Sequence, residues 1–361
     1  MKKIGIITFH RAHNYGAVLQ AYALQKAVKN LGFDVGFIDK QNKKIEEAYK
    51  LYPKFSFMKI KSETRKLAHL LLDFKRKSQR HSAFESFISE NLNLLNVDKN
   101  QPNFSSVVLG SDQIWNFTYT DGFDDLYFGE DCSFSADKIV SYAASMGKAD
   151  LEEKLINQLN RKLAKIDTIG VREDSLRDFI QKNYEMEAEV NLDPTLLLDK
   201  DDWQEISAEN INKEPYLLVY EVQENRITQP TVNYIAKKLG LRVITLSART
   251  DFRTPKDHIS NASPNEYVSL FRNAAYVVTT SFHGTVFSII NNVSFTTIGF
   301  DNEIDIRSKS ILAKLGIPER MIGKDDEISN IKFDINYTKV EDKLSLMKNQ
   351  SLSFLKNAIE S

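Results

Sequence analysis

The first 39 residues have the pattern of a strand, a helix and a second strand, and this pattern constrains the fold most. Residues 3–9 form a short, β-branched apolar run that is typical of a buried strand. Residues 17–32 follow with strong helix formers, an apolar face and a terminal glycine. Residues 35–39 are again apolar and β-branched. A βαβ unit of this length places two parallel strands in one sheet, joined by a right-handed crossover.

The alternation continues and then restarts after Asn191-Leu192-Asp193-Pro194. We expect strands at residues 106–110, 138–143, 166–171, 216–221, 242–246, 276–280 and 294–300, and helices at 151–165, 174–182, 231–239, 265–273 and 286–291. Since single cores stop growing near about 250–300 residues, we expect an α/β protein with two Rossmann-like domains facing a cleft. We place the domains at 1–192 and 213–325, with a helical tail at 326–361 that packs back on the first domain.

Composition indicates an ordinary globular protein. Hydrophobic residues make up 42% of the 361 residues, and 48 Lys and Arg against 49 Asp and Glu leave a net charge of −1. Because no overall field attracts polyanions, we expect no nucleic-acid partner. The single cysteine, Cys132, excludes an internal disulfide and Cys-rich metal sites. The apolar run at residues 4–9 is too short for a secretory signal, and no run approaches a membrane span, so we expect a cytoplasmic location.

Residues 59–80 differ from the rest of the chain. They carry eight basic residues against Glu63 and Asp73, with apolar residues at helical spacing. This pattern predicts an amphipathic basic helix within a helical insertion at about 59–95. Two interpretations stay open: a solvated helix with one face on the N-terminal domain, or a peripheral contact with the inner face of a membrane or an anionic lipid-linked acceptor.

Loops that follow the predicted strands are the candidate site, because ligands of open α/β sheets bind beyond the carboxyl ends of the strands. The first such loop ends in Asn14-Tyr15-Gly16, which permits a tight turn before a helix N-terminus. That N-terminus can bind an anion, although a plain βα turn fits the sequence equally well.

The second loop carries Ser111, Asp112, Gln113 and Trp115. A carboxylate, an amide and an indole together can orient a sugar by stacking and hydrogen bonding. The alternative is that Ser111 or Asp112 caps a helix while Trp115 belongs to the core. The acidic stretch at 121–131 follows, and since such runs are usually solvated, we expect no metal site.

The third loop places Arg172 after an apolar strand and before a helix. A guanidinium beside a helix N-terminus suits a phosphate or a carboxylate. A structural salt bridge to Glu173 or Asp193 is the alternative.

The fourth loop, Ser281-Phe282-His283-Gly284-Thr285, carries a strand directly into a helix with a histidine at the turn. A histidine there can donate to a phosphate or act as a general acid, because its pKa lies near working pH. The hydroxyls of Ser281 and Thr285 and the free N–H groups of the helix would complete an anion pocket. A purely structural histidine is the alternative.

With these residues in view, the chain resembles the polysaccharide pyruvyl transferase family. Five segments match in family order: residues 14–24, 110–116, 171–175, 193–195 and 281–285. The resemblance implies a GT-B-like fold, with the acceptor on the N-terminal domain and the donor on the C-terminal domain. It also implies an enzyme that moves the pyruvyl group of phosphoenolpyruvate onto a sugar of a cell-surface polysaccharide, such as a capsule or exopolysaccharide, or its lipid-linked precursor. A cyclic ketal forms and phosphate leaves, with no cofactor and no metal.

By motif, the phosphoenolpyruvate-binding arginine and histidine of the family fall on Arg172 and His283, and Asp112 is a positional candidate for the base. The expected donor contacts are Arg172, Ser281, Phe282, His283, Gly284, Thr285 and Arg307. The expected acceptor or cleft residues are Asn14, Tyr15, Gly16, Ser111, Asp112, Gln113 and Trp115.

The chain departs from the family pattern at one position. Many relatives have an arginine where this sequence has Ser281, so a cation near the donor phosphate is missing. We expect Arg249 or Arg307 to compensate, and Arg307 follows a strand that ends at the same side of the sheet. The substitution also allows a different donor. A GT-B-type glycosyltransferase that uses a sugar nucleotide and a non-catalytic polysaccharide-assembly protein therefore stay open as alternatives.

Overall fold

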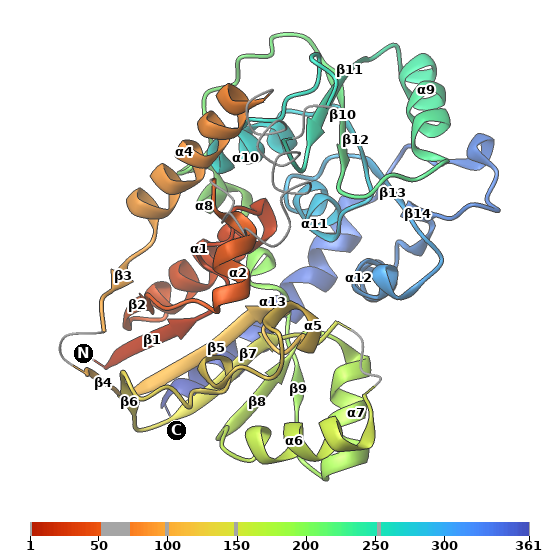
Figure 1. Ribbon diagram of the computed structural model, residues 1–361. Helices are drawn as coiled ribbons and strands as arrows, with labels where there is room; N and C mark the ends of the chain where they lie inside the picture. Colours follow the sequence, from red (N-terminus) through yellow and green to blue (C-terminus); the bar gives the residue numbers. More distant parts are fainter. Residues whose placement is uncertain (1, 52–72, 98–100, 148–150, 251–253, 361) are drawn as a thin grey trace, which may run out of the picture.

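The computed structural model describes residues 2–51, 73–97, 101–147, 151–250 and 254–360 (Figure 1). A seven-stranded sheet occupies the N-terminal part of the chain, in the order β3-β2-β1-β5-β7-β8-β9, and every neighbouring pair is parallel. Its strands are β1 (Lys3–Ile7), β2 (Asp34–Ile38), β3 (Leu94–Leu95), β5 (Ser106–Asp112), β7 (Ile139–Ala144), β8 (Thr168–Val171) and β9 (Glu189–Val190). Parallel pairing follows from the βαβ units that the sequence predicts.

A five-stranded sheet forms the second domain, in the order β11-β10-β12-β13-β14, and it too is parallel throughout. Its strands are β10 (Tyr216–Glu221), β11 (Arg242–Ser247), β12 (Tyr276–Thr279), β13 (Phe295–Ile298) and β14 (Met321–Ile322). A short pair, β4 (Asn103–Phe104) and β6 (Ser135–Ala136), lies beside the first sheet. The predicted class, α/β with parallel sheets in two domains, is confirmed.

Helices connect the strands of both sheets. In the first domain they are α1 (Tyr15–Asn30), α2 (Lys43–Tyr49), α4 (Phe74–Asn91), α5 (Phe117–Thr120), α6 (Glu153–Leu163) and α7 (Asp174–Tyr184). The others are α8 (Lys200–Gln204), α9 (Thr228–Leu239), α10 (Pro264–Arg272), α11 (Phe282–Ile290), α12 (Ile306–Leu315) and α13 (Tyr337–Glu360). None of the described helices combines the length and the apolar character that crossing a membrane requires.

Helices α1, α9, α10 and α11 begin earlier than the sequence pattern predicts. Helix α1 starts at Tyr15 because the side chain of Asn14 accepts a hydrogen bond from the Ala17 N–H, and α11 starts at Phe282 because Ser281 caps it in the same way. The N-terminus of α11 therefore lies close to the end of β12 at Thr279. Most of the predicted basic helix at 59–80 lies outside the described residues. Its last residues belong to α4, which continues to Asn91, beyond the predicted end of the basic helix at residue 80.

One hydrophobic core runs through both domains. Between them, Tyr15 of α1 stacks on Tyr267 of α10 at 4.6 Å between ring centroids, and Trp203 of α8 meets Phe287 of α11 edge-on at 4.8 Å. Large buried aromatic rings supply most of the apolar area of such a contact. The two domains are therefore packed tightly on one side.

Helix α13 returns from the second domain to the first, as Figure 1 shows in blue. Its Ser351 hydroxyl accepts a hydrogen bond from the Leu192 N–H, and near its end the Glu360 carbonyl accepts one from Lys2 Nζ at 3.0 Å. The helix contacts α12 at one end and β7 and α1 further along. It spans both domains.

Candidate functional site

A cleft of about 540 Å³ lies between the carboxyl edges of the two sheets. Its walls come from both domains. Among the lining residues are Asn14, Gly16, Tyr49, Asp112, Gln113, Tyr119, Tyr220, Arg249, Ser281, Phe282, His283 and Arg307. The cleft lies where doubly wound sheets bind ligands, and it unites three of the four loops that the sequence singled out.

The N-termini of α1 and α11 meet across the cleft. A Cβ atom placed on Gly16 would lie 2.8 Å from Cγ of His283, and closer still to Nδ1 and Cε1 of the same ring. Since real Cβ atoms do not approach other atoms that closely, glycine at position 16 is what lets the imidazole rest against the first turn of α1. Two helix N-termini thus face one space, and their free N–H groups favour an anion there.

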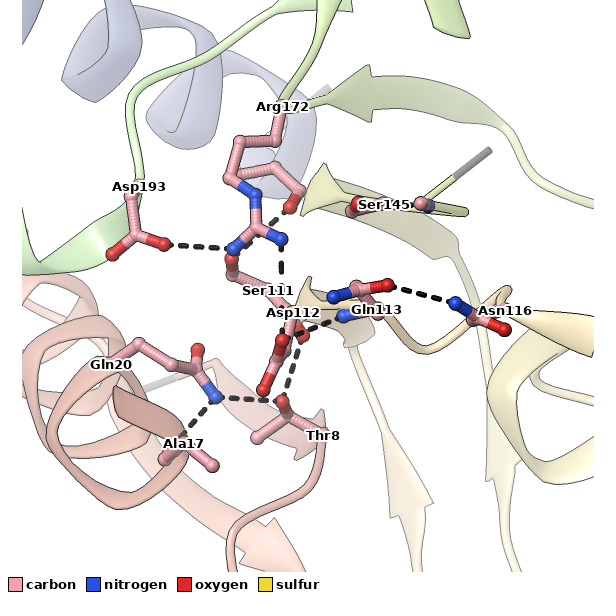
Figure 2. Close-up of polar contacts among 12 residues, drawn as sticks. Thr8, Ala17, Gln20, Ser111, Asp112, Gln113, Asn116, Ser145, Arg172 and Asp193 are labelled. Atoms are coloured by element: carbon pink, nitrogen blue, oxygen red, sulfur yellow. Dashed lines mark hydrogen bonds and ion pairs between the residues drawn. The ribbon is translucent and has the colours of Figure 1, made fainter. Parts of the chain in front are cut away.

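Arg172 is held by carboxylates on three sides, two of which, Asp193 and Asp112, are labelled in Figure 2. Its Nε donates to Glu173 Oε1 at 3.1 Å, Nη1 donates to Asp193 Oδ2 at 2.9 Å, and Nη2 lies 4.0 Å from Asp112 Oδ1. Burial alone would lower the pKa of Arg172, but the charges of Glu173, Asp193 and Asp112 raise it above its ordinary value. Glu173 and Asp193, the two residues that the sequence offered as alternative salt-bridge partners of Arg172, therefore both pair with it. Together they fix the position of the guanidinium.

Asp193 links this arginine to the histidine on the opposite wall. Its carboxylate is fully buried, and its Oδ2 lies 3.7 Å from His283 Nε2, beyond hydrogen-bond distance. Burial would raise the pKa of Asp193, but His283, Arg172 and the Thr195 hydroxyl stabilise the ionised form and hold this pKa below its ordinary value. The carboxylate is therefore ionised and orients the groups around it.

Three nitrogen donors near Phe282 have no hydrogen-bond partner among the described residues. Arg172 Nη2 and His283 Nε2 are both buried without one. The guanidinium of Arg307 forms no hydrogen bond or ion pair with any described residue and lies over the Phe282 ring at 5.2 Å. Burial and the nearby charge of Arg172 lower the pKa of Arg307. Since buried donors in proteins are nearly always paired, these three are free for an anionic ligand.

Six of the predicted site residues do not line the cleft: Tyr15, Ser111, Trp115, Arg172, Gly284 and Thr285. Trp115 is 0% exposed, stacks on Phe128 and donates from its indole to the Tyr127 carbonyl, so the prediction that it lines the cleft is wrong and the core alternative holds. The buried hydroxyl of Ser111 donates to Ala143, and that of Thr285 bonds within its own helix and to Thr297. The Tyr15 hydroxyl bonds to the Ala262 carbonyl and to Arg80.

Gly284 packs on the side chain of Thr279 and has no side chain of its own to offer a ligand. Asn14, Gly16, Asp112 and Gln113 do line the cleft, together with Ser281, Phe282, His283 and Arg307; Arg172 adjoins it through Phe282. Ser111 and Asp112 are neighbours that differ in direction. The Ser111 hydroxyl donates to a carbonyl of the adjacent strand β7, whereas Asp112, whose φ is 78°, lines the cleft.

Sequence reasoning missed several aromatic residues of the cleft, among them Tyr49 and Tyr119. Tyr49 ends α2 and Tyr119 lies in α5, and both line the cavity beside Lys44. Neither short helix carries a strong periodic signal, so no local pattern marks these side chains. The acidic stretch after α5 is paired with lysines instead: Lys162 bonds to Asp125, and Lys165 to Glu130.

Comparisons with known proteins agree with this architecture. The chain is similar to UDP-N-acetylglucosamine 2-epimerase from Rickettsia bellii, with 12% identity, a TM-score of 0.50, and coverage of 100% of this chain and 97% of that one. It is also similar to a putative UDP-N-acetylglucosamine 2-epimerase from Listeria monocytogenes (10% identity, TM-score 0.46, coverage 99% and 91%). A third is the glycosyltransferase SsfS6 of Streptomyces sp. SF2575 (12% identity, TM-score 0.42, coverage 97% and 96%).

The likeness to the Rickettsia bellii structure shows the fold alone, which is GT-B-like as predicted. No curated protein matches the sequence. A family model described as polysaccharide pyruvyl transferase matches residues 14–302, from the cap of α1 to the loop after β13. That range contains every lining residue of the cleft that the sequence singled out except Arg307. The chain belongs to the polysaccharide pyruvyl transferase family.

Proposed function

We propose that this protein transfers the pyruvyl group of phosphoenolpyruvate onto two hydroxyls of one sugar in a cell-surface polysaccharide or its lipid-linked precursor. Membership of the family makes the chain a transferase that acts on polysaccharide. The donor, the ketal product and the acceptor are the proposal. The observation that carries it is the set of three unpartnered nitrogen donors around Phe282.

Phosphoenolpyruvate presents a phosphate and a carboxylate, and both need cationic or N–H donors. Arg172 Nη2, His283 Nε2 and the Arg307 guanidinium provide such donors at one place, beside the N-terminus of α11. Arg307 can also replace the cation that is missing because this chain has Ser281 where many relatives have an arginine. It supplies a guanidinium on the same wall of the cleft, on the first turn of α12.

Ketal formation begins with protonation of the methylene carbon of phosphoenolpyruvate, which leaves an oxocarbenium-like centre at the neighbouring carbon. In our proposal His283 delivers that proton or holds the phosphate, and its Nε2 lies 3.7 Å from the Asp193 carboxylate. A sugar hydroxyl then attacks the centre and gives up its proton. Phosphate leaves with its bonding electron pair, and a second hydroxyl of the same sugar closes the ring.

Asp112 is the base we propose for an acceptor hydroxyl. It ends β5, lines the cleft and lies on the same wall as Gln113. Tyr49 and Tyr119 border the same space and offer ring faces on which a sugar can stack. The acceptor therefore enters from the side of the N-terminal domain, and the donor rests on the C-terminal domain.

Calorimetric titration of phosphoenolpyruvate into the wild type, His283→Ala and Arg307→Ala tests the donor. We expect micromolar binding to the wild type and a clear loss in both variants. Arg177→Ala serves as the matched control, because Arg177 is an arginine outside the cleft that pairs with Asp178. Heat with a sugar nucleotide and none with phosphoenolpyruvate would overturn the proposal in favour of a glycosyltransferase.

A further inference from the structure

A second cluster of chemically reactive side chains lies at the rim of the cleft. Within the described residues, His13, His81 and Glu85 form one group whose ligand atoms all lie within 4.8 Å of one another. His13 belongs to the loop between β1 and α1, and His81 and Glu85 are four residues apart on α4. Residues at that spacing share one helix face, so α4 presents two ligands side by side to the loop.

The geometry suits coordination after a small movement. His13 Nε2 lies 2.8 Å from Glu85 Oε1, and the rings of His13 and His81 meet edge to face at 4.6 Å between centroids. Bond lengths of about 2.0–2.2 Å in a tetrahedral zinc site place neighbouring ligand atoms about 3.4 Å apart. The Glu85 side chain is 44% exposed and free to make the adjustment.

The groups around the cluster leave room for an ion. No described residue forms a hydrogen bond with the ring of His81. Within the cluster itself, His13 Nε2 is hydrogen-bonded to the Glu85 carboxylate. Arg11 Nη1 lies 3.8 Å from Glu85 Oε2 and opposes a second cation, but Asp39 already pairs with Arg11 at 2.6 Å.

We infer that His13, His81 and Glu85 form a binding site for a divalent transition-metal ion of the zinc type. Two imidazoles and one carboxylate are ligands that zinc and its neighbours in the first row accept. Three protein ligands leave at least one coordination position for water or a ligand group.

The site adjoins the cleft without belonging to the proposed donor pocket. His13 precedes Asn14, which lines the cleft, and its ring lies 6.3 Å from that of Tyr49, another lining residue. A bound ion would tie the β1–α1 loop to α4 and so fix the position of the α1 N-terminus. The inference does not rest on pyruvyl transfer, because the proposed reaction needs no metal.

Titration of zinc chloride into the full-length, metal-stripped protein tests the inference by calorimetry. We expect one equivalent to bind, with Kd raised about tenfold or more in His81→Ala and in Glu85→Gln. Cobalt as a substitute should give the visible absorption bands of a low-symmetry, four-coordinate ion. Glu85→Gln keeps the size of the side chain, so a folding defect in His81→Ala would not obscure the result.

Two control variants separate this cluster from other surface ligands. Glu90→Gln changes an exposed carboxylate further along α4, and His258→Ala removes a histidine outside the cluster. Both should bind zinc like the wild type. Zinc binding that is absent in the wild type, or unchanged in His81→Ala and Glu85→Gln, would overturn the inference.

Discussion

The two walls of the cleft differ in how far their polar groups are already paired. On the wall of the seven-stranded sheet, Arg172 is fixed by Glu173 and Asp193, and Asp193 in turn accepts from Thr195. On the wall of the five-stranded sheet, His283 Nε2 and the Arg307 guanidinium have no hydrogen-bond partner among the described residues. A paired network holds geometry, whereas unpaired donors bind ligands. The first wall therefore serves as the frame and leaves Arg172 Nη2 unpaired for a ligand, while the second wall supplies the other two unpaired donors.

The largest effect should come from breaking the frame. Asp193→Ala leaves Arg172 buried with an incomplete set of partners, and such changes cost about 3–5 kcal/mol of unfolding free energy. Chemical denaturation of the variant against the wild type measures this loss. Asp178→Ala, an exposed carboxylate paired with Arg177, should cost under about 1 kcal/mol. Equal losses in the two variants would contradict the distinction between the walls.

The same carboxylate predicts a pH dependence. Because the pKa of Asp193 in the folded protein lies below its ordinary value, the stabilisation it gives is fully present above the pKa of unfolded aspartate, about 4, and is lost as pH falls through the folded pKa. The wild type should therefore lose stability below about pH 4 more steeply than Asp193→Ala. Parallel curves in denaturation across this acid range would show that Asp193 is not the group responsible.

The next largest effect should come from replacing His283, the proposed proton donor. His283→Gln should lower the turnover of phosphoenolpyruvate by about 10²–10⁴-fold, with little change in unfolding free energy because Nε2 has no hydrogen bond to lose. Release of inorganic phosphate in the presence of an acceptor measures turnover. A variant that keeps most of its activity would remove His283 from the acid role.

Removal of the unpaired guanidinium should affect ligand binding and leave the fold intact. Arg307→Ala should weaken phosphoenolpyruvate binding by about 1.5–3 kcal/mol, the usual contribution of a hydrogen bond to a charged group. The melting temperature of the variant should stay near that of the wild type. The guanidinium of Arg307 lies over the face of the Phe282 ring and forms no hydrogen bond or ion pair with a described residue that its removal would break. If instead stability fell and affinity held, Arg307 would belong to the frame.

Gly16→Ala tests the contact between the walls. The added methyl group would overlap the imidazole of His283, which must then move, and overpacking of this kind costs about 1–3 kcal/mol. We expect about a tenfold loss of kcat. In the double variant Gly16→Ala with His283→Ala the overlap is gone, so its unfolding free energy should equal that of His283→Ala alone. A further loss in the double variant would show that the methyl group meets another obstacle.

The smallest effect should come from the rim. Tyr119→Ala changes a side chain that is 49% exposed, so stability should shift by no more than about 0.5 kcal/mol. KM for the acceptor should rise while Kd for phosphoenolpyruvate stays the same. A change in the donor Kd would move Tyr119 from the acceptor side to the donor side.

The sequence predicted the parallel architecture well because strong local signals carry it. Strand β10 occupies the predicted residues 216–221, and the strand that opens the chain is followed by a helix as expected. The helix starts at Tyr15 and Phe282 were predicted too late, since Asn14 and Ser281 act as caps outside the apolar periodicity. Local periodicity predicts the body of an element better than its first turn.

The site was predictable where a residue lies at the end of a strand or in the connection between a strand and the next helix. Asp112, His283 and Arg307 line the cleft because the carboxyl edges of the sheets meet there. Trp115 was wrongly predicted to line the cleft. An indole side chain suits a hydrophobic core as well as a sugar-binding site, and the sequence does not show which of the two it occupies. The cluster of His13, His81 and Glu85 joins segments about 70 residues apart in sequence, and no local pattern connects them.

Helix α13 has a consequence for motion. The chain passes between the domains once before β10 and again before α13, and α13 lies against both domains. Two bodies tied at two places can rotate about the line through the ties but cannot separate or slide freely. Any change in the width of the cleft would therefore be a rotation of one domain relative to the other. Because Gly16 and His283 lie on opposite walls and in close contact, such a rotation would change the spacing between them.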